Sequence, residues 1–594
     1  MLLQSLVNYY EILAEDEESG VPKLGYGKVN VSFALNISKE GELLNVVPLK
    51  VPDSTGKKMV PQSMTVPESV KRAVNISPNF LCDNSSYVFG FDKKGKPIRS
   101  KECFAAFCKL HQDILKNVNN NEAQAVLNYL NSWDIGKASE HPSLAEYYEE
   151  ISSGANLIFK LDGLNSFIHQ SAEIRKAWEA YKQQNANGTR MQCLVTGIEA
   201  PVSRLHPVIK GIKGGQAMGN SLVSFNARAY ESYGREDAQG VNSPVSEFAA
   251  FAYGTVLNYL LADVKNKLSV GDTTVVFWAQ SPKRIYQDFF ALMLQPDEID
   301  NIGSDKQKYV RDLDAVREIK FFFEKLVKGT RSMPDIEEDI QFYVLGVSPN
   351  AARIAVRFFI RNSFGNFITD VARHYEDMAI EKQYTNEPDC IPLWRLLYET
   401  VSPTSKEKAS SPLLSGAVMR SILTGSPYPA ALYSAVMLRI RAEKDISYYK
   451  VAIIKACISR NSKNEYKEVL TMSLNEKCDN KEYVLGRLFA VLEKAQLDAN
   501  PGIKATIKDR YFTAACATPA SVFPILLRLS THHISKAEYG YTSENNIKGI
   551  MDILKVEANP FPKNLSLEQQ GVFILGYYHQ KNSFYKKLGG KSNE

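Results

Sequence analysis

The chain has 594 residues, of which 44% are hydrophobic and 23% are charged, and these values are typical of folded globular proteins. They exclude a disordered, collagen-like or fibrous chain, and at roughly 150 residues per domain they predict about four domains, or two to three large ones. The 71 Lys and Arg residues exceed the 66 Asp and Glu residues by five. This excludes a histone-like or acidic tail protein, but not a nucleic-acid binder whose basic residues gather on one face.

The cysteines and the N-terminus indicate where the protein works. The eight cysteines form no CxxC pair and no zinc-binding cluster, and we expect reduced, packed thiols, which suit the cytoplasm. Residues 1–10 lack the basic stretch and cleavage site of a signal peptide. No apolar run approaches the roughly 20 residues needed to span a bilayer. We therefore expect a soluble, cytoplasmic protein with no membrane partner.

The first part of the chain mixes helix and strand signals. Apolar residues recur at three- and four-residue steps over 2–14 and predict an amphipathic helix. Alternation over 31–38 predicts a half-buried strand, with a turn and then a partner strand at 43–49. Residues 50–70 are rich in Pro, Ser and Thr and predict a loop. The other signals here are a strand end at 87–90 and helical patterns at 101–132 and 173–184.

The middle of the chain continues this mixture. Short apolar runs at 191–195, 273–278 and 342–347 predict strands, and the last two are rich in β-branched and aromatic residues. Residues 248–261 predict a helix. Ser348 and Pro349 then fit the N-cap and the first position of a further helix.

From about residue 380 the strand signals fade. Helical patterns at 483–492, 521–529 and 567–578 are separated by breakers at 500–502 and 559–562. We therefore predict an α+β protein: a mixed N-terminal region with small antiparallel sheets over 1–380, a helical connector over 381–471 and an all-α bundle over 472–594. The bundle contains 16 Lys and Arg residues against 12 Asp and Glu residues, which suits a track for a single strand or a solvated basic end.

The sequence lacks the common catalytic motifs. It contains no G-x-x-x-x-G-K-[ST], no H-E-x-x-H and no G-x-S-x-G. His532 and His533 form the one adjacent histidine pair, and no acidic residue lies within four positions of them. We expect no catalytic residue, no metal and no cofactor.

Three groups of residues could contact nucleic acid. Glycines beside Lys210, Lys213 and Gln216 could expose backbone N–H groups to a phosphate, although a structural glycine loop explains the same pattern. The turn containing Gly25, Tyr26, Gly27 and Lys28 and the loop containing Asn79 and Asn84 could reach base edges, although such turns are mostly only turns. On the predicted helix after Ser348, the following arginines share one face, which could track a polyanion or simply be solvated: Arg353, Arg357 and Arg361.

Several separated blocks together resemble one known family. The chain is similar, essentially from end to end, to the large subunit of the type I-C CRISPR surveillance complex, the Csd-type member of Cascade. The blocks that carry the resemblance are CLVTG at 193–197, RLHP at 204–207, KG at 210–211, GGQ at 214–216, SFN at 224–226, SYG at 232–234, NSPVS at 242–246, PNFLCDN at 78–84 and GRLFAVLE at 486–493.

The resemblance implies a specific function. Such subunits read the protospacer-adjacent motif in double-stranded DNA, begin duplex opening for the R-loop and help to recruit a helicase-nuclease, without cutting DNA. The implied partners are CRISPR RNA, target DNA, the backbone subunits, the crRNA-processing subunit and the small subunits. The C-terminal part resembles a small subunit, which the family also makes from an internal start, and Met472 matches that start. A metal-dependent nuclease and a purely structural scaffold subunit are the alternatives.

The resemblance also suggests roles for single residues. For motif reading we carry over these six: Gly25, Tyr26, Gly27, Lys28, Asn79 and Asn84. For contact with the nucleic-acid backbone, or for the first three with the neighbouring subunit, we expect the following six: Lys210, Lys213, Gln216, Arg353, Arg357 and Arg361. The motif sequence, the subunit numbers and the strand that each residue touches do not follow from the sequence.

Overall fold

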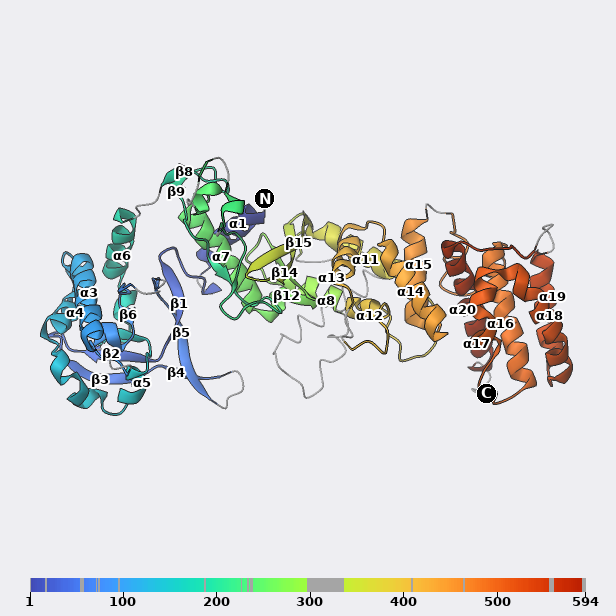
Figure 1. The fold of residues 1–594 in the computed structure, drawn as a ribbon, viewed down its shortest axis with the longest axis horizontal. Coiled ribbons are helices and arrows are strands. Elements are labelled where there is room, and N and C mark those ends of the chain that lie inside the picture. The colour runs from blue at the N-terminus through green and yellow to red at the C-terminus, as the bar shows by residue number, and fades with distance from the viewer. Residues whose placement is uncertain are drawn as a thin grey trace. The chain divides into compact units, whose positions relative to one another are not determined.

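A computed structural model describes the chain, and its residue contacts divide it into two compact units (Figure 1). The first unit comprises Met1–Val208 with Ser221–Tyr259, and the second comprises Ile209–Asn220 with Leu260–Glu594. The predicted boundaries after residues 380 and 471 both fall inside the second unit. The structure describes residues 2–16, 19–53, 58–70, 72, 75–93, 97–185, 189–225, 227–231, 234–235, 239–295, 336–406, 410–462, 465–554 and 560–589.

The core of the first unit is a four-stranded sheet of order β3-β2-β7-β6 under helices. Strand β2 (Phe33–Ile37) is buried along its whole length, pairs antiparallel with β3 (Leu43–Pro48) and pairs parallel with β7 (Leu157–Leu161). The parallel pair departs from the expected antiparallel arrangement. The short β6 (Cys82–Asp83) completes the sheet. Apolar side chains from these strands pack with those of α3 (Pro97–Leu115), α4 (Asn121–Ser132) and α6 (Ala172–Gln184).

A second sheet corrects the predicted loop at 50–70. Strands β1 (Tyr26–Val31), β5 (Met59–Pro67) and β4 (Lys50–Pro52) form a three-stranded antiparallel sheet of order β1-β5-β4, drawn as a long ribbon in Figure 1. Polar and apolar side chains alternate along β1 and β5. On one face Val31 and Val66 pack against side chains of the neighbouring sheet, and the other face is exposed; the partners are Ala34, Cys82 and Ile158. The prolines and hydroxyl side chains in β5 hid this alternation.

The predicted strand end at 87–90 is also wrong. Residues 85–88 form the short helix α2 (Ser85–Val88), because Asn84 caps its N-terminus by accepting a hydrogen bond from the Ser86 amide. The amphipathic helix expected over 2–14 is confirmed as α1 (Leu2–Glu15), and Tyr10 packs edge-on against Phe248 and Phe251 of α7 (Glu247–Ala262). The unit also contains α5 (Tyr148–Ser152) and the two-stranded sheet of β8 (Arg190–Gln192) and β9 (Glu199–Pro201).

The second unit begins with a six-stranded sheet of order β10-β11-β15-β14-β13-β12. The predicted strand at 273–278 is confirmed as the fully buried β13 (Thr273–Ala279), and the run at 342–347 lies in β14 (Gln341–Asn350). Phe277, Phe290 and Phe342 pack together on one face of the sheet. Trp278, Tyr343 and Phe359 stack on one another. The remaining strands are β10 (Val208–Ile209), β11 (Asn220–Ser221), β12 (Lys267–Val270) and β15 (Arg353–Ser363).

The helix predicted to start at Ser348 and Pro349 does not form. Both residues end strand β14, which turns back through Ala351, at a φ of +50°, into β15. Ten residue pairs join the two strands, with an irregularity between Gly346 and Val347. The β-branched and aromatic residues between 354 and 360 favour the strand, in which Ile354 and Phe358 are buried and Val356 is exposed.

All described elements after β15 are helices, as the sequence predicts, and one continuous hydrophobic cluster runs from the sheet to the last helix. The α+β class is confirmed. In the part of the chain that the structure describes, no helix is long and apolar enough to cross a lipid bilayer. The helices of this unit are α8 (Ile285–Leu294), α11 (Phe364–Met378), α12 (Leu393–Tyr398), α13 (Pro412–Thr424), α14 (Ala430–Glu443), α15 (Tyr448–Asn461), α16 (Lys481–Ala499), α17 (Ile507–Ala517), α18 (Pro519–Lys536), α19 (Gly540–Leu554) and α20 (Leu567–Gly589).

Candidate nucleic-acid interface

The two N-terminal loops singled out in the sequence are bound to one short segment of backbone. The carbonyl oxygen of Gly25 accepts hydrogen bonds from the Glu68 amide and from the Trp178 indole, each at 2.8 Å. Two residues after Glu68, the Val70 amide donates to the side-chain oxygen of Asn79 at 2.9 Å. The segment that follows β5 therefore brings Gly25 and Asn79 together, which sequence separation alone could not show.

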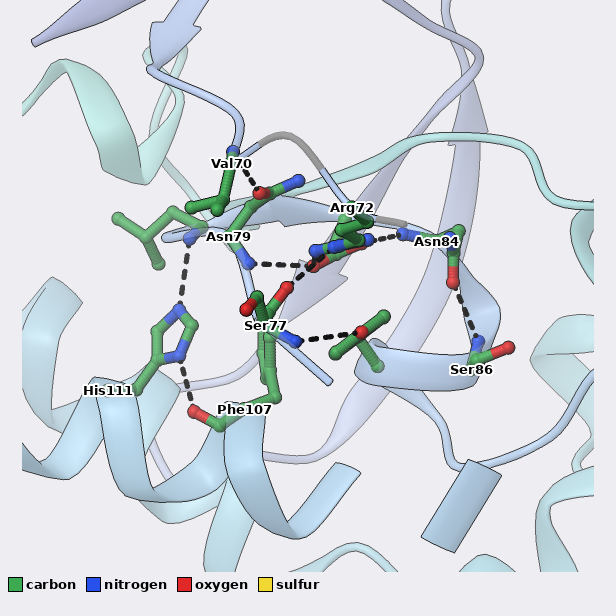
Figure 2. A network of polar contacts seen from close by, with 11 residues as sticks. Val70, Arg72, Ser77, Asn79, Asn84, Ser86, Phe107 and His111 are labelled. Carbon is green, nitrogen blue, oxygen red and sulfur yellow. Dashed lines mark hydrogen bonds and ion pairs between the residues drawn. The ribbon is translucent and has the colours of Figure 1, made fainter. Parts of the chain in front are cut away.

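A buried ion pair fixes the second loop (Figure 2). The guanidinium of Arg72 donates to both carboxylate oxygens of Asp83, and its Nε donates to the Ser77 carbonyl at 2.6 Å. Asp83 also accepts from the backbone amides of Asn79 and Asn84, each at 2.8 Å. Burial raises the pKa of Asp83, and Arg72 opposes that rise. Four donors on one carboxylate make this loop a preorganised platform.

A histidine supports the same loop from the helix below it. Leu81, with a φ of +54°, donates its amide hydrogen to Nε2 of His111 at 3.0 Å. Because Nε2 accepts, Nδ1 carries the proton and donates to the Phe107 carbonyl at 2.8 Å. Burial lowers the pKa of His111 to about 4, which keeps the ring neutral. The sequence analysis missed Arg72, Asp83 and His111, since only the fold brings them together.

The predicted motif-reading residues have different surroundings. Lys28 is exposed on β1, while the Tyr26 ring is buried and burial raises the pKa of its hydroxyl. Asn79 is only 8% exposed, and Asn84 caps α2. The side-chain oxygen of Asn79 thus accepts from the Val70 amide, and that of Asn84 accepts from the Ser86 amide. The remaining residues of this group, Gly25 and Gly27, lie just before and within β1.

Four polar side chains, one of them Lys28, form one exposed surface, which we call the β1–β5 outer face. Lys28 lies opposite Thr65 and Asn30 lies opposite Ser63, so all four point to the same side of the sheet. All four are exposed, and none is acidic. The sequence analysis missed Ser63 and Thr65 because it predicted a loop over 50–70, and it missed Asn30 because the strand predicted there began at residue 31. The alternation of Ser63, Met64, Thr65 and Val66 was the available signal.

The glycine-rich loop is held to the sheet of the second unit. The side-chain oxygen of the buried Asn220 accepts from the Gln216 amide at 3.0 Å, and its nitrogen donates to the Ala351 carbonyl at 2.8 Å. A Cβ on Gly215 would press against this Asn220 side chain, so glycine is needed there. Lys213 donates through its backbone to Thr274 and through Nζ to the Gly271 carbonyl at 3.2 Å. Lys210 and Gln216 are exposed.

The three arginines lie on strand β15 instead of a helical face. Arg357 donates through Nε to Ser348 at 2.7 Å, and its Nη2 lies 3.8 Å from Asp272. Gly271 and Asp272 are neighbours in the β12–β13 turn, so Lys213 and Arg357 both contact this turn. We call these two residues the basic sheet end. Arg361 bonds to Gln341 at 2.7 Å. At about 3.3 Å per residue, Arg361 lies roughly 26 Å along the strand from Arg353, so the structure does not gather all three.

One comparison identifies the family. The sequence model of a family described as CRISPR-associated protein (Cas_Csd1) matches residues 6–585. The chain belongs to this family. The resemblance to the Csd-type large subunit is thereby confirmed, and the protein is a CRISPR-associated protein. No curated protein matches the chain.

The family blocks occupy several parts of this Cas_Csd1 protein. Residues 78–84 form the loop around Asp83, residues 214–216 lie in the glycine-rich loop and residues 486–493 lie in α16. Cys193, from the CLVTG block, accepts a hydrogen bond from the Ser246 amide just before α7, at 3.2 Å. Polar contacts around the sulfur outweigh its burial and lower the pKa of Cys193 to about 7. Asn226, Ser232, Tyr233, Asn559 and Lys591 lie outside the described residues.

The described residues of the Cas_Csd1 chain show no grouping of three or more His, Cys, Asp or Glu side chains that could hold a metal ion. His532 and His533 lie near the end of α18. All eight cysteines lie in the described part of the chain, and six of them are buried.

Proposed function

We propose that this protein is the non-catalytic large subunit of the type I-C surveillance complex, and that it reads the protospacer-adjacent motif in double-stranded DNA and promotes duplex opening in the cytoplasm. Family membership supports the CRISPR role. The observation that carries the DNA-reading role is the rigid loop around Asp83, bound through residues 68–70 to the start of β1, beside an exposed face that contains Lys28 and no acidic side chain.

In this proposal one surface contacts base edges and a second contacts the sugar-phosphate backbone. Lys28, Asn30, Ser63 and Thr65 of the β1–β5 outer face provide one cation and three groups that can donate and accept hydrogen bonds, which is what base edges require. Gly25, Gly27, Tyr26, Asn79 and Asn84 keep this face in position. Lys210, Lys213, Gln216 and the arginines of β15 contact the sugar-phosphate backbone, which orients the protein without reading sequence.

The remaining roles follow the family resemblance. The guide RNA supplies sequence recognition by base pairing, so the protein needs only a short motif and backbone contacts to start opening. The partners are CRISPR RNA, target DNA, the backbone, processing and small subunits, and a helicase-nuclease recruited after binding. The bundle from Met472 onward is also made as a separate small subunit.

The motif-reading role is tested by Lys28→Ala in the assembled complex. Affinity for duplexes with and without the motif is measured at two salt concentrations. Loss of a base-edge contact weakens binding to the motif-containing duplex by about 1–3 kcal/mol and leaves the other duplex unchanged. Lys39→Ala removes an equally exposed lysine from the turn after β2 and serves as the matched control. An unchanged motif preference in Lys28→Ala would show that the motif is read elsewhere.

The nuclease alternative is tested with the purified chain, labelled DNA and Mg²⁺ or Mn²⁺. Metal-dependent cleavage without a helicase-nuclease would overturn the non-catalytic role.

The internal start is tested by Met472→Leu. This variant should remove a product of about 120 residues and leave the full-length chain, which an immunoblot against the C-terminus can follow. A short product that persists would refute the start at Met472.

A further inference from the structure

The second unit contains a cavity of about 360 Å³ next to the basic sheet end. Its walls come from the β12–β13 turn, the end of α8, helix α12 and helix α13. Apolar side chains such as Leu268, Leu393 and Leu397 form its interior. Its full lining is Lys213, Leu268, Ser269, Val270, Gly271, Leu294, Gln295, Leu393, Trp394, Leu397, Tyr398, Ser410 and Met419.

Two aromatic side chains line this cavity and are also open to solvent. Trp394 and Tyr398 lie four residues apart on α12 and therefore on one side of that helix. Trp394 is 54% exposed and Tyr398 is 39% exposed. The guanidinium of Arg395 lies 5.3 Å from the centre of the Tyr398 ring. Large aromatic faces that remain exposed beside an apolar cavity favour a ligand with a flat ring.

The charge at the cavity favours an anionic ligand. Among the described residues that line the cavity, Lys213 is the one charged side chain, and none is a carboxylate. Lys213 Nζ donates one hydrogen bond to Gly271, and an ammonium group has two further hydrogens. Asp272 is the next residue of the same turn. The guanidinium of Arg357 on β15 lies 3.8 Å from the Asp272 carboxylate, which partly balances its charge.

We propose that this cavity binds one unpaired nucleobase of a nucleic-acid strand, with the adjoining phosphate against Lys213. The inference rests on the proposed function and adds to it a site for a base that has left its duplex. A volume of about 360 Å³ lies at the lower end of the range of about 300–1,000 Å³ that is typical of small-ligand pockets, which suits a single planar base. Stacking on Trp394 and Tyr398 does not depend on which base is present. This suits a protein that must act on targets of any sequence.

The test uses the full-length chain and oligonucleotides that contain 2-aminopurine, a base whose fluorescence falls when it stacks. One oligonucleotide is single-stranded, and another is a duplex with an unpaired 2-aminopurine. We expect binding to quench the fluorescence in the wild type. Trp394→Ala should abolish most of the quenching and weaken binding about tenfold, with an unchanged salt dependence, because it removes a stacking surface and no charge. Tyr541→Ala, which removes a 65% exposed aromatic side chain from α19, is the matched control and should behave as the wild type.

The outcomes separate the two proposals. Lys213→Ala and Arg357→Ala should lower the affinity and reduce the salt dependence, because they remove phosphate contacts. One outcome is that the wild type binds with strong salt dependence and Trp394→Ala quenches the fluorescence as much as the wild type does. This outcome overturns the base site and leaves the DNA-binding role standing. A wild type that binds no oligonucleotide overturns both. Replacing the 2-aminopurine with an abasic nucleotide gives a check that needs no protein variant, since it should weaken wild-type binding about as much as Trp394→Ala does.

Discussion

The carboxylate of Asp83 shows how a single residue organises the candidate motif-reading region. It is 1% exposed, yet it accepts hydrogen bonds from Arg72 and from the backbone amides of Asn79 and Asn84. The Arg72 guanidinium also lies 4.0 Å from the centre of the Tyr87 ring. The sequence pointed to Asn79 and Asn84 because of their residue type. It gave no hint of their bonding, because Arg72 lies 11 residues from its partner and no local spacing predicts that contact.

Removing Arg72 should therefore destabilise the protein. Arg72→Met leaves a buried carboxylate without its counter-charge, and we expect a loss of about 3–5 kcal/mol in the free energy of unfolding of the first unit, measured by urea denaturation. Lys93→Met breaks the exposed pair with Glu149 and should cost at most about 1 kcal/mol. The double variant Arg72→Met/Asp83→Asn should recover part of the loss. If Arg72→Met is as mild as Lys93→Met, the buried pair does not hold the loop.

At the level of elements, the predictions succeeded where one period dominated and failed where signals competed. Helices α1, α16 and α20 and strand β2 follow clear apolar periods, and β13 is an unbroken run of β-branched and aromatic residues; all were predicted. In the prediction, the helix-capping preference of Ser348 and Pro349 was given more weight than the strand pattern that follows. The arginines of β15 were therefore assigned to a helix. Local capping signals describe only a few residues, whereas ten cross-strand pairs stabilise the β14–β15 hairpin.

The crossing of α16 and α20 provides a test at the same scale. A Cβ on Gly486 would overlap the Phe573 carbonyl, and one on Gly576 would overlap the Tyr483 carbonyl, so glycine lets the two backbones touch. Gly486→Ala should lower the stability of the helical region by about 1–3 kcal/mol, measured by thermal or urea denaturation. Gly549→Ala is the matched control, because nothing lies within 4 Å of its Cβ. Alanine there should be neutral or stabilise by up to about 1 kcal/mol. Equal effects of the two changes would contradict the close crossing.

At the scale of the whole molecule, buried histidines set the response to acid. Five histidines are at most 7% exposed, and burial lowers their pKa values to about 4, or to about 3 for His374. Several accept or donate hydrogen bonds within the core, as His206 does to Tyr253 and His579 to Tyr483. These five are His111, His169, His206, His374 and His579.

The protein should lose stability as the pH falls from about 6.5 to about 4. In this range the unfolded chain, with histidine pKa values near 6.5, binds protons that the folded chain excludes, so each such histidine removes up to about 1.4 kcal/mol per pH unit. Above pH 7 the histidines are neutral in both states and contribute no slope. The apparent unfolding temperature, measured between pH 7.5 and 4.5, should fall less steeply in His579→Gln than in the wild type. Parallel curves for the two proteins would show that His579 is not responsible.

The two candidate contact surfaces differ in how far the sequence could reveal them. Lys28 and Lys213 were selected as candidate nucleic-acid contacts because charge and neighbouring glycines are visible in the sequence, and both residues are exposed. Their surroundings were not visible, since the β1–β5 outer face and the β12–β13 turn depend on strand pairing. The cavity beside Trp394 went unnoticed for the same reason, because its lining extends from Lys213 to Met419, which are 206 residues apart in the sequence.

The unbroken core of the second unit has a consequence for a chain that begins at Met472. In the full-length protein, α14 and α15 cover part of the terminal bundle: Tyr433 fits over Gly571 and donates to the Leu567 carbonyl at 3.0 Å, and Arg441 binds Gln570 at 2.5 Å. The proposed chain translated from Met472 lacks both helices. The patch that they cover would then be exposed to solvent and available to bind a neighbouring molecule. If such short chains assemble into a row in which each binds its neighbour through this patch, the full-length protein, whose patch is already covered, would form one end of the row.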